Sequence, residues 1–239
     1  MFHPKGPSFV ELAQQGLSSM EKGYDLLAPK FEFTPFRTPD WILSAIVPHL
    51  GTTKSVDRAI DVCCGTGAGM RYLRPLCRES VTGVDISAGM LDEAKRQLAG
   101  APGDAKIELI RGDAFDMPFT DTFDIATCFG ALGHILRKDE PRFVEAVRKT
   151  LKIGGRFAFI TSTVPPVFSL RWMMSRGFNA AMRVRNLVWR PKFVMYYLTF
   201  VLPEIRKTLE DGGFSVDEKG GLFPKPFDDY KLVIATRVR

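Results

Sequence analysis

The sequence predicts an α/β fold, a Rossmann-like sheet of seven mostly parallel strands with helices on both faces. Short apolar runs alternate with amphipathic runs through the middle of the chain, which is the pattern of a parallel, doubly wound sheet. The first of these runs ends in a glycine-rich turn, as a strand does where it passes into a helix at the ligand-binding edge of such a sheet. With 239 residues, 45% of them hydrophobic, the chain can form one such domain.

A helical cap is expected before the sheet, over residues 1–52. Residues 9–27 read as one helix with a mixed face. Thr38-Pro39-Asp40 opens a second helix, because these residue types are typical of a helix start. An aromatic-rich loop joins the two helices.

The core of the domain is expected over residues 53–163. Its main helices are predicted at residues 88–98 and 141–151, and residues 152–155 read as a turn, because two glycines follow just after the second helix. Five short apolar runs are the predicted strands: residues 59–62, 81–85, 107–111, 123–128 and 156–161.

The rest of the chain divides into a helical lid insertion, residues 164–203, and a C-terminal helix with two strands, residues 204–239. Only a short turn region separates those two strands, so we expect them to pair antiparallel, with the last strand antiparallel in the sheet. Residues 1–239 thus form a single domain.

Cysteine usage and hydropathy restrict the class of protein. Four cysteines, two of them adjacent, are no disulfide framework in a chain of this length, and no second Cys or His cluster completes a metal site. The longest apolar run, residues 193–202, is about half the ~20 residues that a membrane-spanning helix needs. We therefore expect a metal-free, soluble, cytoplasmic protein.

Acidic residues mark the ends of the first three predicted strands. Asp61 lies near the end of the first, Asp85 ends the second, and Asp113 follows the third. Because ligands bind at the carboxyl ends of strands in an open parallel sheet, these carboxylates and the glycine turn are expected at one site. Asp85 is suited to accept hydrogen bonds from ribose hydroxyls and Asp113 from an adenine amino group.

The glycine turn departs from two phosphate-binding motifs. The dinucleotide fingerprint G-x-G-x-x-G needs a glycine where this chain has Met70, and no Gly-Lys-Ser/Thr follows as in a P-loop. The chain thus has an acidic residue for a ribose and one for an adenine, but no phosphate-binding motif. This combination suits a nucleoside cofactor that has no phosphate. The alternative is a plain strand-to-helix turn without a ligand.

Five segments in order resemble the motifs of class I S-adenosylmethionine-dependent methyltransferases: "AIDVCCGTGAG", "VTGVDISAGMLDEAKRQ", "IELIRGDAFDMPF", "FDIATCFGALGHI" and "LKIGGRFAFIT". The resemblance covers roughly residues 56–162 and implies S-adenosylmethionine as cofactor. It implies contacts to the methionine part from the first motif, to the ribose from the second, and to the adenine from the second and third. The cofactor-binding residues are then Asp61, Cys63, Gly65, Thr66, Gly67, Asp85, Ile86, Met90, Asp113, Ala114 and Phe129.

The first motif narrows the resemblance. The form "DVCCGTG" is similar to the subgroup that methylates ubiquinone and menaquinone precursors, although Cys63 stands where the family usually has glycine. We interpret Cys63 and Cys64 as small packing residues rather than nucleophiles. Cys128 ends the fourth strand, where RNA cytosine methyltransferases keep a nucleophilic cysteine, but it lacks their neighbouring proline pattern and is also interpreted as core.

The acceptor pocket is expected beyond the fourth strand. His134 is titratable and suits a general base near neutral pH, with a capping or packing histidine as the alternative. The loop lacks the Asp/Asn-Pro-Pro-aromatic tetrapeptide that would indicate methylation of amino groups in nucleic acids. The aromatic residues expected to wall the pocket are Tyr24, Phe31, Phe33, Phe36, Trp172 and Phe178.

The insertion holds the net charge of the protein. It contains six of the 33 basic residues and none of the 27 acidic ones, together with eight of the 27 aromatic residues. Arg176, Arg183 and Arg190 recur every seven residues, and Gly177 and Pro191 are expected to segment the helix. Three interpretations stay open: a lid with an apolar core face and a solvated basic face, a lid over a hydrophobic acceptor that also touches an anionic membrane, and an RNA-binding face.

These observations favour methyl transfer to a small, apolar or lipid-like acceptor such as a quinone precursor, polyketide or fatty-acid derivative. A macromolecular acceptor such as RNA and a non-catalytic binding protein of the same fold are the alternatives. Nucleic acid is not the expected partner, and the oligomeric state is not predicted.

Overall fold

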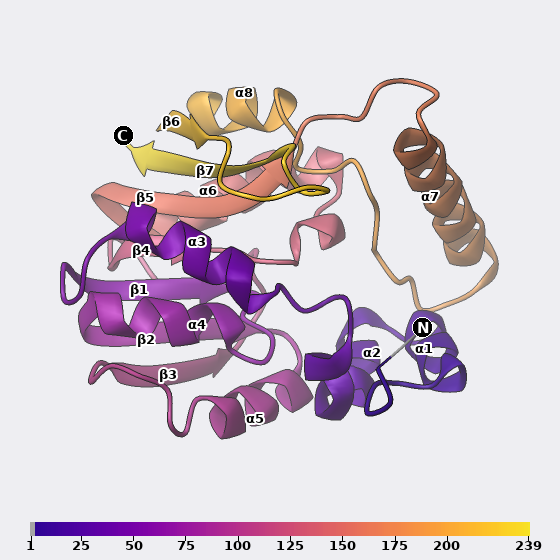
Figure 1. The fold of residues 1–239 in the computed structure, drawn as a ribbon, viewed down its shortest axis with the longest axis horizontal. Helices are drawn as coiled ribbons and strands as arrows, with labels where there is room; N and C mark the ends of the chain where they lie inside the picture. The colour runs from indigo at the N-terminus through magenta and orange to yellow at the C-terminus, as the bar shows by residue number, and fades with distance from the viewer. Residues whose placement is uncertain (1–2) are drawn as a thin grey trace.

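The computed structural model describes residues 3–239 and is built on one seven-stranded sheet. The strands are β1 (Val56–Val62), β2 (Cys77–Asp85), β3 (Lys106–Arg111), β4 (Phe123–Thr127), β5 (Leu151–Ser162), β6 (Phe214–Lys219) and β7 (Tyr230–Arg237). They lie in the order β3-β2-β1-β4-β5-β7-β6 (Figure 1). β1 to β5 run parallel, and β7 runs antiparallel to both of its neighbours. The predicted sheet, with its last strand antiparallel, is confirmed.

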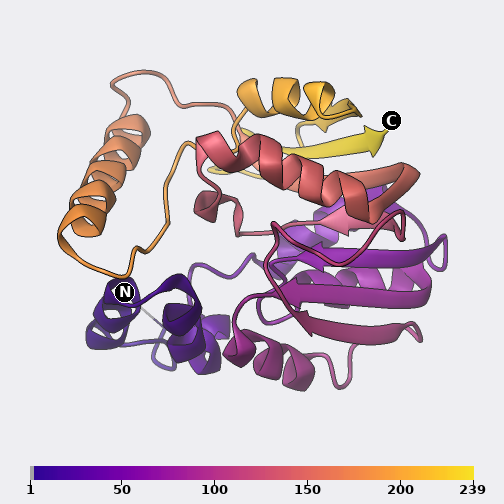
Figure 2. The same cartoon turned by 180° about the vertical axis from the view of Figure 1, so that it is seen from behind.

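Helices cover both faces of the sheet (Figures 1 and 2). On one face α3 (Asp40–Leu50), α4 (Ala68–Leu73) and α5 (Ala88–Gln97) pack with β1 and β2 around a buried core. On the other face α6 (Glu140–Thr150) and α8 (Glu204–Asp211) cover β4, β5 and β7 around a second core that is rich in phenylalanine. β1 and β4 are neighbours although β2 and β3 lie between them in sequence, so the strand order reverses there.

The N-terminal cap differs from the expected single helix. Residues 9–27 form two helices, α1 (Phe9–Leu17) and α2 (Met20–Leu27). The prediction was wrong because Ser19 adopts an extended conformation and its hydroxyl accepts a hydrogen bond from the backbone N–H of Lys22, which starts a new helix. A short 3₁₀ helix, η1 (Ala28–Phe33), then leads toward α3.

The expected turn at residues 152–155 lies inside β5. The strand begins at Leu151, directly after α6, and Gly154 adopts a left-handed conformation with φ of 78°. The register against β4 shifts between the pairs Phe123–Leu151 and Ile125–Arg156. The two glycines therefore form an irregularity within the strand rather than a turn before it.

The insertion leaves and rejoins the sheet at one point, because Thr163 forms a parallel bridge with Leu202. It contains one helix, α7 (Leu170–Val188), which runs through Gly177 without a break and ends before Pro191, so the expected segmentation at Gly177 is wrong. α1, α2 and α7 all lie beyond the carboxyl ends of the parallel strands (Figure 1). No helix within residues 3–239 is both long and apolar enough to cross a membrane.

Candidate active site

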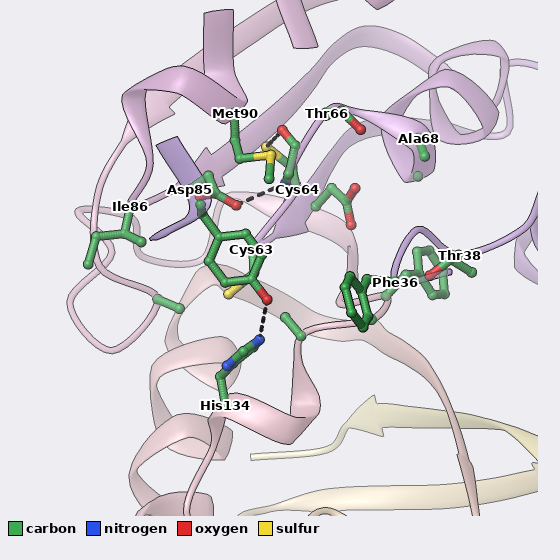
Figure 3. Close-up of a pocket in the computed structure, with 18 of the residues that line it drawn as sticks. Phe36, Thr38, Cys63, Cys64, Thr66, Ala68, Asp85, Ile86, Met90 and His134 are labelled. Atoms are coloured by element: carbon green, nitrogen blue, oxygen red, sulfur yellow. Dashed lines mark hydrogen bonds between the residues drawn. The ribbon is translucent and has the colours of Figure 1, made fainter. Parts of the chain in front are cut away.

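A cavity of about 460 Å³ lies at the carboxyl ends of β1, β2 and β4, where the strand order reverses (Figure 3). Its walls come from the turn after β1, the ends of β2 and β3, the loop after β4 and the N-terminal cap. Its volume is in the range of small-molecule sites. This is the position at which the sequence predicts a ligand.

The glycine turn shapes the floor of the cavity. Cys63, which lines the cavity, has a φ of 56°, and Gly65 and Gly67 have φ values of 52° and 85°. Cys63 thus adopts the left-handed conformation that glycine adopts most easily, which explains why glycine suits this position. Nothing lies within 4 Å of the place that a Cβ of Gly65 would occupy, whereas a Cβ on Gly67 would come within 2.9 Å of Leu98. Gly65 thus leaves its backbone accessible, and Gly67 is needed for packing against α5.

Asp61 lies beneath this turn, with 2% of its surface exposed. The hydroxyl of Thr127 donates a hydrogen bond of 2.7 Å to its Oδ1, and a Cβ on Gly69 would collide with its Oδ2. Burial, which outweighs the hydrogen bond from Thr127, raises the pKa of Asp61 to about 7. Asp61 is therefore a buried carboxyl group at the cavity wall that forms no ion pair within residues 3–239.

Asp85 ends β2 and holds two turns together. Its Oδ2 accepts a hydrogen bond of 2.9 Å from the N–H of Gly65, and its Oδ1 accepts one of the same length from the N–H of Ser87. Burial raises the pKa of Asp85 despite these bonds. Asp113 lies in the wall contributed by the loop after β3, where its Oδ1 accepts from the N–H of Phe115.

Two carboxylates fasten the N-terminal cap to loops that line the cavity. Asp25 of α2 accepts hydrogen bonds from the hydroxyl of Ser87 and the N–H of Gly89, at the N-terminus of α5. Glu32 accepts a bond of 2.6 Å from the hydroxyl of Thr66 and forms an ion pair of 2.7 Å with Arg37. The cap therefore forms a wall of the cavity with fixed position.

Tyr24 and His134 both line the cavity and meet there, although they are 110 residues apart in sequence. The Tyr24 hydroxyl lies 2.6 Å from Nε2 of His134. Nδ1 of His134 lies 2.5 Å from the carbonyl oxygen of Val194, which can only accept a hydrogen bond. Nδ1 therefore bears hydrogen, and in the neutral imidazole Nε2 accepts from Tyr24.

The environment keeps both members of this pair neutral. Burial lowers the pKa of His134 below its usual 6.5, and the carbonyl of Val194 offsets only part of this effect. Burial, with the nearby Asp85 and Cys63, raises the pKa of the Tyr24 phenol. At neutral pH the pair is thus a phenol that donates to a basic imidazole nitrogen.

A second cavity, of about 590 Å³, adjoins the first. The residues that line both are Gly130, His134, Met195, Tyr197 and Tyr230. Its outer wall comes from α7, through Met174, Ser175 and Phe178 among others. The Tyr24–His134 pair therefore lies close to the junction of two cavities, one under the cap and one under α7.

Most of the residues selected from the sequence lie together. Those that line the first cavity are Tyr24, Phe31, Phe36, Asp61, Cys63, Gly65, Thr66, Asp85, Ile86, Met90, Asp113, Ala114, Phe129 and His134. Phe178 lines the second cavity and Gly67 packs behind the first. Phe33 and Trp172 line neither cavity: Phe33 stacks on His3, and the half-buried Trp172 contacts Phe168 and Arg176.

Several site residues have no signal in the sequence. Asp25, Glu32 and Thr127 form the hydrogen bonds described above, and Met195 and Tyr197 line both cavities. Each is an ordinary polar or apolar residue in its own segment, and only the approach of distant segments gives it a place in the site. Val194, which fixes the tautomer of His134, acts through its backbone alone.

The residues present fit S-adenosylmethionine. Two buried carboxyl groups, Asp61 and Asp85, line the cavity, and no cation of the described residues is among the groups that set their pKa values. Buried carboxylates need hydrogen-bond donors or positive charge, and this cofactor has an ammonium group and ribose hydroxyls to offer. Ile86 and Met90 supply the apolar surface that an adenine ring needs.

Comparison with known proteins is consistent with this fit. A family model described as "Methyltransferase domain" matches residues 59–155. The chain is 31% identical over 194 residues to a demethylmenaquinone methyltransferase of Desulfitobacterium hafniense. The matched stretch covers 80% of this chain and 74% of the relative.

Two solved structures are similar in fold. The DhpI–SAH complex has a TM-score of 0.66 at 20% identity and covers 97% of this chain and 100% of its own. Magnesium protoporphyrin IX methyltransferase from Synechocystis with bound SAM has a TM-score of 0.55 at 18% identity, over 83% of this chain and 79% of that one. With the relative from D. hafniense and the site above, they lead to one assignment: the chain belongs to the class I S-adenosylmethionine-dependent methyltransferases.

Proposed function

We propose that this methyltransferase acts on a small, largely apolar acceptor with an acidic hydroxyl, such as a quinol, and that Tyr24 and His134 remove the proton of the acceptor. The observation that supports this most directly is the 2.6 Å contact between the Tyr24 hydroxyl and Nε2 of His134 where the two cavities meet. The similarity to demethylmenaquinone methyltransferases supports a quinone-like acceptor.

In this proposal the first cavity binds the cofactor, which supplies an activated methyl group when bound. Asp85 accepts hydrogen bonds from the ribose hydroxyls, and Asp61 with the turn Cys63–Gly65–Thr66–Gly67 faces the methionine part. Ile86 and Met90 pack on the adenine, Asp113 and Ala114 lie at its edge, and Phe129 closes the wall between cofactor and acceptor. All of these residues except Gly67 line the first cavity.

The proton of the acceptor leaves through the phenol. A hydroxyl of the acceptor donates to the Tyr24 oxygen, whose own proton is already directed at His134 Nε2. As the acceptor attacks, its proton passes to Tyr24 and the proton of Tyr24 passes to His134, which becomes an imidazolium. Burial lowers the pKa of His134, so its imidazole is unprotonated at neutral pH and has a free nitrogen to accept this proton.

The second cavity suits an apolar acceptor. Ile160, Met174, Phe178, Met195 and Leu198 are among its lining residues. The hydroxyl of Thr161 already donates its hydrogen to the carbonyl oxygen of Phe200, so it has no donor left for a polar ligand. Tyr24, Phe31 and Phe36 extend the apolar surface into the first cavity.

Transfer of a labelled methyl group to demethylmenaquinone, kept reduced as its quinol, tests the proposal, with lipid and aqueous cell extracts as broader acceptor pools. We expect label in the quinol or the lipid fraction. Tyr24→Phe and His134→Gln should each lower kcat by about 10²-fold or more, the usual contribution of general acid–base catalysis. The kcat of the wild-type enzyme should fall only in acid, at a pH below the usual histidine pKa of 6.5, because burial lowers the pKa of His134.

Tyr197→Phe is the matched control. Tyr197 lines both cavities, and its hydroxyl makes no hydrogen bond within residues 3–239, so its loss should change kcat little. S-Adenosylhomocysteine should bind all three variants with similar affinity. Full activity of Tyr24→Phe would refute the proton path, and label found only on RNA or protein would refute the class of acceptor.

A further inference from the structure

The outward face of α7 is apolar. Leu170, Met173, Gly177, Ala180, Val184 and Leu187 follow one another at spacings of three and four residues, which places them on one side of the helix. All of them are exposed, and Leu187 has 81% of its surface accessible. The exposed Phe168, Val188 and Trp189 extend this surface at the two ends of the helix. We call these nine residues the α7 face.

The inward side of α7 mixes polar and apolar residues, because Phe178 lines the second cavity and two asparagines are buried. Asn179 and Asn186, seven residues apart, are buried, and their side chains bond to the backbone of Tyr197 and Phe193. The expected apolar core face of the insertion is therefore wrong for α7, because none of its residues belongs to either buried core, whereas Arg176 and Arg183 are exposed as the same interpretation expects. Asparagine satisfies the backbone of an irregular segment, which leaves the apolar side chains on the outside.

Positive charge borders the α7 face. Arg176 and Arg183 lie along one side of the stripe and are exposed. Arg171, on the other side of the helix, forms an ion pair of 2.8 Å with Asp229, so Arg176 and Arg183 are the cations of α7 that we expect to meet lipid phosphates. Arg190 and Lys192 follow the helix, and residues 164–203 contain no acidic residue. The guanidinium of Arg176 lies 5.3 Å from the ring of Trp172, so its stem covers part of the apolar surface.

We propose that the α7 face docks on an anionic membrane surface, with its apolar side chains in the acyl boundary and the arginines on lipid phosphates. An exposed apolar stripe flanked by cations and free of acids is complementary to a bilayer of negatively charged lipids. A helix that lies in the interface needs no spanning length, which agrees with the absence of a spanning helix in residues 3–239. α7 also walls the second cavity, so docking brings that cavity to the lipid surface.

Co-sedimentation of the full chain with vesicles tests this inference. We expect binding to vesicles made of equal parts phosphatidylglycerol and phosphatidylcholine, and at least tenfold weaker binding to phosphatidylcholine alone. Val184→Glu with Leu187→Glu, and separately Arg176→Glu with Arg183→Glu, should each lower the partition coefficient for anionic vesicles at least tenfold. No acceptor or cofactor is present, so the outcome is independent of the proposed methyl acceptor.

Ile153→Glu is the matched control. Ile153 is 63% exposed and Val184 is 61% exposed, but Ile153 lies near the amino end of β5, whereas α7 lies beyond the carboxyl ends of the parallel strands. This variant should bind vesicles as the wild type does, and unchanged thermal unfolding of every variant shows that the fold survives. Equal binding to both vesicle types, or no binding, would overturn the inference. So would self-association through the same residues, or RNA retention that depends on Arg176 and Arg183, without vesicle binding.

Discussion

Three carboxyl groups from distant parts of the chain set the electrostatics of the cofactor site. Asp61 and Asp85 come from adjacent strands, and Asp25 reaches the same loops from the N-terminal cap. Burial is the main cause that raises the pKa values of Asp61 and Asp85. The charge of Asp85 adds to the rise at Asp61, and the charge of Asp25 adds to the rise at Asp85. Because no cation of the described residues balances Asp61, its charge must be balanced by a ligand or removed by a proton.

Cofactor affinity should therefore depend on pH through Asp61. Its folded-state pKa is about 7, so in the free protein Asp61 is protonated below pH 7 and ionised above it. A ligand ammonium favours the ionised form, so the Kd for S-adenosylhomocysteine should rise by up to about tenfold per pH unit below 7. Isothermal titration calorimetry in buffers of different ionisation enthalpy measures this and the proton released near pH 7.

Asp61→Asn is the comparison for this titration. It keeps the size of the side chain but removes the charge, so it should bind S-adenosylhomocysteine more weakly at pH 8 and with no dependence on pH between 6 and 8. A wild-type affinity that stays constant from pH 6 to 8 would contradict the link to Asp61.

The position of α7 depends on polar contacts rather than on packing in the cores of the sheet. None of its residues belongs to either buried core of the sheet. The side chain of Asn186 donates to the carbonyl of Phe193 and accepts from the N–H of the same residue. The side chain of Asn179 makes the same two hydrogen bonds with the backbone of Tyr197. Each asparagine thus satisfies both backbone groups of one residue in the segment that lines the cavities.

Asn186→Ala should loosen α7 without unfolding the sheet. The change leaves a buried N–H and a buried carbonyl of Phe193 without partners, at a cost of about 1–3 kcal/mol. Because the loss is local, proteolysis within residues 164–203 should become faster while the main thermal transition moves little. Limited proteolysis followed by mass spectrometry locates the cuts. Ala180→Ser is the control, because Ala180 is an exposed residue of the same helix. This variant should be cut at the wild-type rate.

At the scale of the whole molecule, the sheet with its helices from α3 onward is a self-contained core. Of the expected cap, residues 1–52, only the part before α3 is an addition to this core, and "cap" below means that part. Both buried clusters are made of residues after position 40, so neither includes α1 or α2. The cap contacts the core through polar side chains, namely Asp25 to α5, Glu32 to Thr66, and an ion pair between Glu21 and Arg111. It supplies Tyr24 and one wall of the cofactor cavity.

Removal of residues 1–33 should therefore leave a folded sheet that has lost its activity. Circular dichroism should show a cooperative transition within several degrees of the full chain, because both cores are intact. The affinity for S-adenosylhomocysteine should fall at least tenfold, and methyl transfer should fall further because Tyr24 is gone. Retention of full transfer by the shortened chain would show that the cap has no part in catalysis.

The sequence predicted the parts of the protein that are determined by local pattern. The five parallel strands, the antiparallel end of the sheet, and Asp61, Asp85 and Asp113 at its edge follow from apolar periodicity and from the glycine turn. Its errors were also local in origin: Ser19 starts a second helix in the cap, and Gly154 lies within a strand. Phe33 and Trp172 were selected as aromatic residues, but aromatic character alone does not say which way a ring points.

The sequence by itself determined the sheet and the cofactor edge, because a strand-and-helix period and a turn of small residues leave few other folds. Only the tertiary structure decided what happens beyond that edge. The contact of Tyr24 with His134 joins residues 110 positions apart, and the outward direction of the α7 apolar stripe depends on two buried asparagines. Amphipathic periodicity gives the faces of a helix, but only the packing of the chain decides which face lies inside.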